Sequence, residues 1–422
     1  MLTLNTLREE RDAVLAALAK RGLDAAEAVD GILEADVERR ATQTRLDALL
    51  AESNTASRQI GEFMRSGQRE EAEALKATVG GNKAAIAELK DAMSALDARI
   101  HDALCHLPNT PCDLVAAGKS ADDNVEVFRS GALPELAEGA VPHWDLASKY
   151  DLIDFDLGAK VTGAGFPFYK GKGAKLQRGL IRFFLERAED AGYLEYIPPH
   201  MINADSGFGT GQLPDKEGQM YHMQDDDLFM IPTAEVPLTN IYRDTLLNAD
   251  DLPIKLCGYT PCFRREAGSY GKDVRGLNRL HQFDKVEIVQ LAHPTESYGK
   301  LDEMVEHVKG LLDTLELPYR ILRLCGGDMG FTSAMTYDFE VWSAAQERWL
   351  EVSSVSNFET YQANRLKCRF RGEHGNELVH TLNGSALALP RIVAALLENH
   401  QRPDGIRIPE GLQPFVGFTS IH

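Results

Sequence analysis

The residues most able to do chemistry lie first in the string CFRREAGSYGKDVRGLNRLHQFDKVEIV, which is typical of two strands joined by a long polar loop. Strand alternation puts Arg264 and Glu266 on one face of the first strand. It puts Phe283, Lys285 and Glu287 together on one face of the second. Because guanidinium groups pair with phosphate and aromatic rings stack on bases, this surface would suit a nucleotide. A solvated hairpin with no special function explains the same stretch about equally well.

A second strand, HTLNGSALA, runs directly into the start of a helix. Its alternation places Thr381, Asn383 and Ser385 on one face. Pro390 is typical of a first helical turn, and Arg391 follows it at once. An arginine there adds its charge to the exposed amide donors of the helix N-terminus, which suits an anionic ligand. Alternatively, Arg391 would merely cap the helix or form an ion pair at the surface.

The elements that must position these residues have the patterns of ordinary core segments. Lys175–Ala191 carries a helical spacing of apolar residues, and the run GYLEYIPP that follows it indicates a strand. The stretch from about 111 to 150 is rich in Gly, Pro, Asp and Glu and predicts an irregular connection. The prolines of LPNTP, at 107–111, interrupt helical hydrogen bonding. We therefore expect two domains, at 1–110 and 111–422.

Two heptad seams in the first domain predict a pair of long helices. Between them, the string RSGQ indicates a helix end and a reversal of the chain. We expect an antiparallel coiled-coil hairpin with helices of roughly 30 residues, which would reach on the order of 45 to 50 Å. The seam positions are Ile32, Ala35, Arg39, Thr42, Leu46, Leu49, Ser53, Ala56, Ile60 and Phe63, then Leu75, Val79, Asn82, Ile86, Leu89, Met93, Leu96, Ile100, Ala103 and Leu107.

Charge limits what such a hairpin could bind. The formal net charge of -19 over 422 residues argues against a protein that coats nucleic acid without specificity. Residues 28–104 hold ten Lys and Arg against fourteen Asp and Glu, so any RNA contact must use a few placed cations. A coiled coil for self-association explains the heptads about as well as a ligand-binding arm. The candidates for phosphate contacts are Arg39, Arg40, Arg45, Arg58, Arg65, Arg69, Lys76 and Lys83.

Neither export nor membrane insertion is predicted. The N-terminal string MLTLNTLREERDAV carries early charges that a secretion signal lacks, and no apolar run approaches the length of about 18 residues that spans a bilayer. The six cysteines form no CxxC pair, which favours free thiols in a reducing compartment. We expect a cytoplasmic protein without membrane association.

Together these segments resemble motifs 1, 2 and 3 of the class II aminoacyl-tRNA synthetases, and in detail the bacterial type of the seryl-tRNA synthetase family. The resemblance implies an α+β fold, in which the N-terminal hairpin precedes a class II domain with an antiparallel sheet flanked by helices. It also implies a homodimer whose interface includes motif 1 and Pro199. With the hairpin, the similar strings cover nearly the whole chain: GTGQLP, IPTAEVPLTN, CFRREAGSYGKDVRGLNRLHQFDKVE, GDMGF, EVSSVSN and HTLNGSALALPR.

The activity that this resemblance implies is activation of L-serine by ATP, with Mg²⁺, to give seryl-adenylate and pyrophosphate. The seryl group would then pass to serine tRNA, and in the same way to selenocysteine tRNA. The hairpin would grip the long variable arm of serine tRNA. No side-chain nucleophile is required, because the substrate carboxylate attacks phosphorus and the protein supplies position and charge compensation.

Mapped by motif, the resemblance assigns the catalytic role to Arg264 and Arg391. Arg264 would hold the α-phosphate and the serine carboxylate, where negative charge accumulates. Glu266 would accept a hydrogen bond from the adenine amino group and Phe283 would stack on the ring. Arg275 and Arg391 would steady the β and γ phosphates. The ATP-binding set is Arg264, Arg265, Glu266, Arg275, Phe283, Glu351, Val352, Ser353, Ser354 and Arg391.

Glu351 and Ser354 match the family's magnesium ligands, and their oxygen donors suit that ion. Strict alternation would place these two side chains on opposite faces of a strand, so we expect a bulge or a strand end between them. The resemblance also assigns a serine pocket, in which carboxylates hold the ammonium group and paired polar groups reject alanine. Thr233 and Glu235 are expected to be extended. The pocket set is Thr233, Ala234, Glu235, Arg264, Glu287, Asn383 and Ser385.

Two residues depart from the family pattern, and two other functions compete with this one. Pro390 precedes the motif 3 arginine and Ala386 replaces an expected glycine, either of which could shift the helix start. An amino acid ligase that loads a carrier protein would lack the long hairpin. A catalytically dead RNA-binding homologue would be expected to lose Arg264, Glu266, Glu351 or Arg391, and all four are present.

Overall fold

The chain folds into two compact units in a computed structural model that describes residues 1–215, 218–266, 275–373 and 375–422. The sheet unit comprises Met1, Ala17–Gly22 and Asn109–His422. The hairpin unit comprises Leu2–Ala16 and Leu23–Pro108. Residues 267–274 of the loop predicted between the strands of motif 2 lie outside the described residues.

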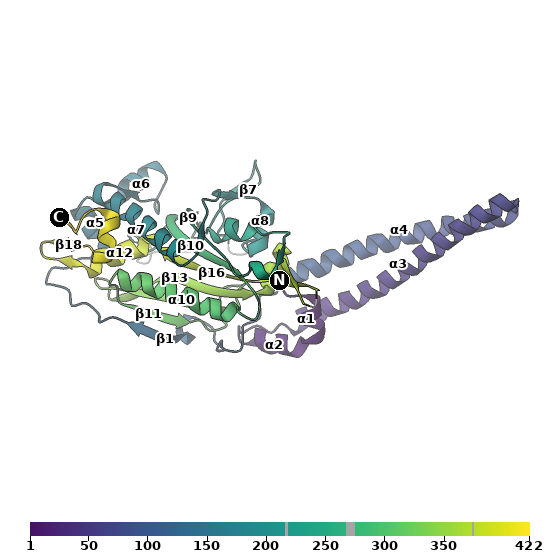
Figure 1. Cartoon of the computed structure of the whole chain (residues 1–422), viewed down its shortest axis with the longest axis horizontal. Coiled ribbons are helices and arrows are strands. Elements are labelled where there is room, and N and C mark those ends of the chain that lie inside the picture. The colour runs from purple at the N-terminus through teal and green to yellow at the C-terminus, as the bar shows by residue number, and fades with distance from the viewer. Residues whose placement is uncertain (216–217, 267–274, 374) are drawn as a thin grey trace. The chain divides into compact units, whose positions relative to one another are not determined.

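The hairpin unit is built on two long helices, α3 (Ala26–Ser66) and α4 (Arg69–Cys105), which lie side by side (Figure 1). The chain reverses at Gly67, whose left-handed φ of 80° ends α3 as the RSGQ string predicted. The helices contain 41 and 37 residues, so at about 1.5 Å per residue they extend roughly 60 and 55 Å. The predicted length of about 30 residues was wrong, because α3 continues beyond its apolar seam at both ends and α4 begins before its seam.

The apolar seams are confirmed by burial. Ile32 and Ala35 are 1% and 2% exposed on α3, and Leu96 and Ile100 are 8% and 4% exposed on α4. The buried positions follow the 4,3 spacing because an underwound pair of helices keeps one stripe of each facing the other. Two short helices precede the hairpin: α1 (Leu4–Glu9) and α2 (Arg11–Ala19).

The sheet unit is organised around a mixed sheet that is mostly antiparallel. Among the described residues this sheet has eight strands, in the order β1-β11-β12-β13-β16-β10-β9-β4. All neighbours pair antiparallel except β4 and β9, which run parallel. In sheet order the bounds are Val125–Ser130, Tyr319–Arg323, Met335–Ser343, Arg348–Glu359, His380–Ala388, Gln282–Ala292, Ile254–Phe263 and Leu194–Glu195.

Three helices cover one face of this sheet and enclose the main core. Phe183 and Leu180 of the first helix are fully buried there with Val286 and Ile288 of β10 and Val355 of β13. This is the side of β10 that alternation predicted to be apolar. The helices are α7 (Gly171–Asp190), α10 (Ser297–Thr314) and α12 (Leu389–Asn399), of which α7 confirms the predicted helix.

The opposite face of the sheet carries a second, smaller core. Val289 and Leu291 of β10 pack there with Ala234, Leu238 and Leu366. On this face, the polar side chains of β10 and β16 therefore lie next to the apolar side chains of the smaller core. The short helices on this side are α8 (Ala204–Thr210), α9 (Glu235–Asn240) and α11 (Thr360–Leu366).

The stretch 111–150, predicted to be irregular, contains a strand and a helix, so that prediction was wrong there. β1 forms an edge of the large sheet against β11, and five of its six residues are exposed. Val125 and Val127 alternate with Glu126, but this apolar period is too short to distinguish a strand from a loop, and both valines are exposed. The helix is α5 (His143–Lys149).

The remaining elements are small. They are α6 (Phe155–Val161), α13 (Gln413–Val416), β2 (Ile153–Asp154), β3 (Phe168–Tyr169), β5 (Met201–Ile202), β6 (His222–Met223), β7 (Leu228–Met230), β8 (Leu246–Asn248), β14 (Arg369–Gly372), β15 (Gly375–Leu378), β17 (Gln401–Arg402), β18 (Gly405–Arg407) and β19 (Ser420–Ile421). All six cysteines have free thiols, as predicted. Within the described ranges, no helix combines the length and apolarity that a membrane span requires.

Candidate active site

The polar residues of β10 and β16 lie on one face of the sheet, as alternation predicted. The two strands pair antiparallel so that Glu287 lies opposite Ser385, and Asn383 lies opposite Val289. Lys285 forms an ion pair with Glu287 at 2.6 Å between Nζ and Oε2. A carboxylate that is only 2% exposed requires such a partner, because an isolated buried charge is very costly.

The segment before α9 brings two more polar side chains to this face. The Thr233 hydroxyl donates to Glu287 Oε2 at 3.3 Å and accepts from the Glu235 backbone N–H at 3.2 Å. Glu235 is the first residue of α9, so the prediction that it is extended was wrong. Ala234 is the N-cap and already has helical φ and ψ, so the helix begins two residues after Thr233. The Ala234 side chain is itself fully buried in the smaller core.

Glu235 is held by a residue that the sequence did not single out. Gln362 of α11 donates from Nε2 to Glu235 Oε1 at 2.7 Å, and its own Oε1 accepts from the Thr381 hydroxyl at 2.7 Å. Burial raises the pKa of Glu235 to about 7, and the nearby Glu287 carboxylate acts in the same direction. The site therefore holds a carboxylate poised to gain a cationic partner. No local pattern marks Gln362, since it lies on a short helix far along the chain.

Arg264 and Phe283 come together across the motif 2 strands. The guanidinium carbon of Arg264 lies 5.3 Å from the centre of the Phe283 ring, and its Nε donates to the Pro232 carbonyl at 3.4 Å. β9 ends at Phe263, so Arg264 lies just past the strand rather than on it. The side chain of Arg264 is thereby fixed between the motif 2 hairpin and the segment that leads to Thr233.

The prediction that Glu266 shares a strand face with Arg264 was wrong. Its φ of 48° turns the backbone into the left-handed region, and its carboxylate forms an ion pair with Arg279, a partner that the sequence did not suggest. The neighbouring Arg265 is exposed, and its backbone N–H donates to the Gln219 carbonyl at 2.9 Å. Both side chains thus lie at the edge of the site.

Of the two arginines assigned to the outer phosphates, Arg391 belongs to motif 3 and Arg275 to the motif 2 loop. Arg391 donates from Nη1 to the Glu351 carbonyl at 2.6 Å and from Nε to the Asn278 carbonyl at 3.0 Å. The guanidinium of Arg275 lies 4.6 Å from the centre of the Trp144 ring. Arg275 is exposed, and the Arg391 side chain keeps 31% of its accessible surface. Arg391 Nη1 also lies 3.9 Å from Glu351 Oε2, and both guanidinium groups keep surface that an anion could reach.

A β-bulge brings Glu351 and Ser354 to the same face of β13, as we expected. Glu351 pairs with Glu340, but Ser353 pairs with Phe339, so β13 contains one more residue than β12 at this point. Val352 is the extra residue and is 1% exposed in the main core. The Ser353 hydroxyl donates to the Ser385 carbonyl at 2.6 Å. The side chains of Val352 and Ser353 thus make contacts inside the protein: Val352 packs in the core and Ser353 binds a backbone carbonyl.

Asp338 lies beside this pair and was missed from the sequence. The Ser354 hydroxyl donates to Asp338 Oδ1 at 2.6 Å. Burial raises the pKa of Asp338 well above its ordinary value, and the Glu351 carboxylate raises it further. The sequence did contain a sign of this residue, because Asp338 and Glu340 are two positions apart and therefore lie on the same face of β12. In the described part of the chain, no group of three or more His, Cys, Asp or Glu side chains is arranged to hold a metal ion.

The motif 3 departures are accommodated in the fold. α12 begins at Leu389, and Pro390 occupies its first turn, where its missing N–H has no intrahelical partner to lose. Ala386 is fully buried on β16. The strand and helix that the motif predicted are both present.

Some of the candidate cations of the hairpin unit form ion pairs with carboxylates, and the others are exposed on the helix surfaces. Arg39 and Arg40 lie within 3.0 and 3.1 Å of Asp36, a carboxylate that also binds Arg8 at 2.7 Å. The side chain of Asp36 is 1% exposed, and nothing in the heptad pattern predicted it. Lys76 pairs with Glu73 at 2.6 Å. The other candidates, Arg45, Arg58, Arg65, Arg69 and Lys83, are exposed on the helix surfaces.

Comparison with known proteins gives matches over the whole chain. Residues 1–111 match the family model for the seryl-tRNA synthetase N-terminal domain, and residues 220–400 match that for the tRNA synthetase class II core domain (G, H, P, S and T). The serine–tRNA ligase of Salinibacter ruber is 53% identical, over 100% of this chain and 99% of that protein. That of a Synechococcus strain is 46% identical, over 99% and 97%.

A solved structure shows the same fold. The seryl-tRNA synthetase of Pyrococcus horikoshii complexed with ATP superposes with a TM-score of 0.93 and 35% identity, covering 100% of this chain and 99% of that one.

Proposed function

The chain belongs to the seryl-tRNA synthetase family, and on this premise we propose which of its residues activate L-serine with ATP and deliver it to tRNA. It is a class II aminoacyl-tRNA synthetase that joins serine to tRNA. The serine carboxylate attacks the α-phosphorus of ATP, and pyrophosphate leaves. A hydroxyl of the terminal tRNA ribose then attacks the carbonyl of seryl-adenylate, and AMP leaves. The protein contributes position and charge compensation.

The observation that carries the serine pocket is a set of buried polar groups on one face of the sheet. Glu235 and Glu287 are 7% and 2% exposed, and Thr233, Asn383 and Ser385 are 5%, 8% and 8% exposed. Two carboxylates suit an ammonium group, and the hydroxyl and amide groups suit a substrate hydroxyl. Without that hydroxyl, buried donors and acceptors would lose a partner, which costs about 1–3 kcal/mol each.

Amino-acid-dependent exchange of pyrophosphate into ATP tests this pocket. We expect exchange with serine, and exchange with alanine lower by about 10²-fold or more, because alanine leaves the polar groups of the pocket unpaired. Threonine adds one methyl group and tests the fit of the pocket directly. Absence of exchange with serine, or faster exchange with alanine or threonine, would refute the pocket assignment.

The pKa of Glu235 predicts how serine binding depends on pH. Because burial raises this pKa to about 7, the carboxylate takes up a proton as the pH falls through 7 and loses its attraction for the serine ammonium group. The KM for serine should therefore be about tenfold higher at pH 6 than at pH 8, since the ionised fraction changes by about that factor. Glu287 and Lys285 also face this group. In a Glu235→Gln variant the KM should be high and nearly independent of pH over the same range; a pH-dependent KM in that variant would contradict the assignment.

For ATP, we propose that Phe283 stacks on adenine while Arg264 compensates charge at the α-phosphate. The 5.3 Å contact between Arg264 and Phe283 supports this, since it places the cation beside the ring that would carry the base. Arg275 and Arg391 would hold the β and γ phosphates. Glu266 would accept from the adenine amino group, with Arg279 holding its carboxylate in place.

A divalent cation accompanies ATP in this class, and we propose that it is Mg²⁺, held by Glu351 and Ser354. The bulge on β13 supports this, because it places both oxygen donors on one face. The hydrogen of the Ser354 hydroxyl is directed to Asp338, so its lone pairs remain for a cation. Mg²⁺ is commonly held by one or two carboxylates together with substrate phosphates. When bound, the ion neutralises phosphate charge.

We also propose a homodimer that uses motif 1. Leu194 and Ile197 are 61% and 88% exposed and lie next to Pro199, so large apolar side chains are open to solvent on this segment. An Ile197→Glu variant should shift the protein from dimer to monomer in analytical ultracentrifugation, because it places a charge in an apolar contact. A Leu133→Glu variant, at another exposed leucine, should leave the dimer intact. A dimeric Ile197→Glu protein would place the interface elsewhere.

Residues 1–110 are proposed to act as the tRNA-binding arm, and 111–422 as the adenylating domain. The exposed cations on α3 and α4 support this, since phosphate contacts require them. The arm carries more acid than base, so its grip would depend on shape and on a few arginines. We place the protein in the cytoplasm, which its six free thiols support.

A further inference from the structure

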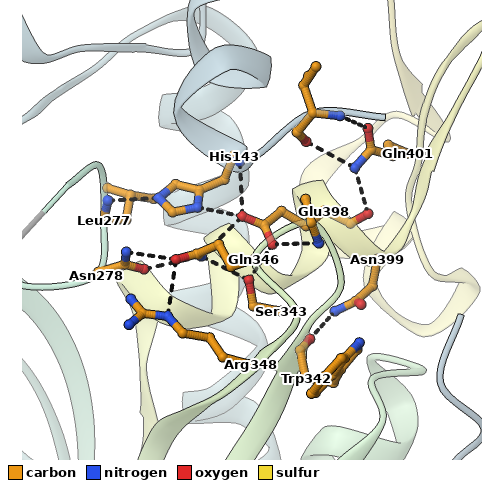
Figure 2. Close-up of polar contacts among 12 residues, drawn as sticks. His143, Leu277, Asn278, Trp342, Ser343, Gln346, Arg348, Glu398, Asn399 and Gln401 are labelled. Atoms are coloured by element: carbon orange, nitrogen blue, oxygen red, sulfur yellow. Dashed lines mark hydrogen bonds and ion pairs between the residues drawn. The ribbon is translucent and has the colours of Figure 1, made fainter. Parts of the chain in front are cut away.

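A buried polar network links α12 to α5 and to the end of the motif 2 loop (Figure 2). Its centre is Glu398, which binds the Ser343 hydroxyl through Oε2 and His143 through Oε1. Glu398 and His143 are both fully buried. The backbone N–H and the ring Nδ1 of His143 lie 3.0 and 2.7 Å from Glu398 Oε1. Neither residue belongs to the motifs that define the site.

The second ring nitrogen of His143 determines its tautomer. The backbone N–H of Leu277 donates to His143 Nε2 at 2.9 Å. Because a backbone N–H only donates, Nε2 must carry no proton, and Nδ1 must donate its hydrogen to Glu398. Burial alone would raise the pKa of Glu398, but hydrogen bonds from His143 and Ser343 outweigh it and hold that pKa below its ordinary value. The pair is therefore a neutral imidazole on a carboxylate.

Glu398 is also linked to Asn278, the loop residue after Leu277, through the side chain of Gln346. The Nε2 of Gln346 donates to Glu398 Oε1 at 3.2 Å. The Oε1 of Gln346 accepts from the Asn278 side-chain amide at 3.0 Å. The same carboxylate thus holds Leu277 through His143 and Asn278 through Gln346. Two consecutive residues of the loop are fixed to one buried group.

Both arginines assigned to the outer phosphates border this anchored pair. The Asn278 carbonyl accepts from Arg391 Nε at 3.0 Å. Arg275 lies two residues before Leu277 and stacks on Trp144, the residue that follows His143. Glu398 follows Arg391 by seven residues on α12, which is about two turns and therefore the same side of the helix. One rigid helix carries both the anchor and one of the arginines.

The loop approaches His143 so closely at position 276 that a Cβ there would push against the imidazole ring. Gly276 has φ of 66°, and a Cβ added there would lie 2.3 Å from His143 Nε2. A buried carboxylate is seldom retained for stability alone, because well-packed apolar groups often stabilise a fold as much. We therefore attribute the buried carboxylate of Glu398 to a need to hold the loop in a fixed position.

We propose that Glu398 and His143 are positioning residues that hold Arg275 and Arg391 in register for the outer phosphates of ATP. This inference rests on the proposed assignment of those two arginines to the β and γ phosphates. The adenine end of the site, around Phe283, is outside the network. Loss of the network should therefore weaken binding of ATP while leaving binding of AMP, which lacks both outer phosphates, nearly unchanged.

The test compares the Kd for ATP and for AMP by calorimetry in the full-length protein. A His143→Phe variant removes both ring nitrogens but keeps a planar side chain, and should raise the Kd for ATP about tenfold with that for AMP within twofold. A His143→Gln variant keeps a donor and an acceptor on one planar group and should restore ATP binding to within threefold. The KM for serine in pyrophosphate exchange should change by less than twofold in both. Should His143→Phe fail to fold, Gly276→Ala, which presses a Cβ against His143 Nε2, should show the same selective loss of ATP affinity.

An Arg275→Ala variant separates failure of this inference from failure of the proposed function. If Arg275→Ala weakens ATP but His143→Phe does not, the positioning role is overturned while the phosphate assignment stands. If Arg275→Ala weakens neither ATP nor AMP, the phosphate assignment itself is wrong. Equal weakening of ATP and AMP in His143→Phe, with no rescue by glutamine, would show that the network only stabilises the fold.

Discussion

An Arg264→Ala variant should exchange pyrophosphate into ATP about 10³-fold more slowly than the unmodified protein at saturating serine and ATP. Negative charge builds up on the α-phosphate as the serine carboxylate attacks, and removing one preorganised donor to such charge typically costs 10²- to 10³-fold in kcat. Arg264 offers two donors in a planar fork. The loss should therefore lie at the upper end of this range.

The size of the loss should depend on the guanidinium group rather than on packing. An Arg264→Lys variant keeps the charge but not the fork, and should recover only part of the activity. Arg182→Ala removes an arginine of α7 whose side chain is 63% exposed, and should exchange at the normal rate. The melting temperatures of all three should agree within about 2 °C. Near-normal exchange in Arg264→Ala would show that the phosphate assignment is incorrect.

Deleting the distal part of the hairpin should separate the two halves of the reaction. The Arg39–Asp97 ion pair, at 3.8 Å, gives the register of α3 against α4 and indicates that Leu46 and Leu89 lie at about the same level. Replacing residues 46–89 with a short glycine-rich turn keeps the Asp36 cluster and removes five candidate cations. Serine-dependent exchange should stay within about twofold, because all the proposed adenylation residues lie in the sheet unit.

Transfer of serine to tRNA should then fall by about 10³-fold in kcat/KM. Three lost charge-assisted contacts of about 1.5 kcal/mol each account for a change of that size. Charging of serine tRNA, measured with radiolabelled serine, gives the result, and exchange in the same preparation controls for folding. A deletion variant that charges tRNA at the normal rate would refute the role of the arm. A variant that loses both reactions would show that the hairpin is needed for adenylation.

Local periodicity was sufficient for much of the fold. A seam of apolar residues at 4,3 spacing and a glycine at the turn predict a hairpin, because both depend on residues close in the chain. For the same reason, alternation predicted which side of β10 carries Lys285 and Glu287. Helix lengths were underestimated because α3 and α4 begin before their apolar seams. The edge strand β1 was missed because its apolar run is short and exposed.

Contacts between distant residues were decided only by the tertiary structure. Gln362 lies 127 residues from Glu235, and Glu398 lies 255 residues from His143, yet each pair is hydrogen-bonded. A buried polar residue needs a hydrogen-bond partner, which can come from any part of the chain, and no local period in the sequence identifies that partner.

The hairpin and the motif residues were thus determined by the sequence itself, through spacing and through family resemblance. The tertiary structure decided how these residues are held. It added Asp338 beside Ser354, placed the bulge at Val352, and attached Arg39 to Asp36. It also joined the end of the motif 2 loop to α12. The physical reason is that periodicity encodes which side of an element is buried, whereas the partner of a buried charge is set only when the elements pack.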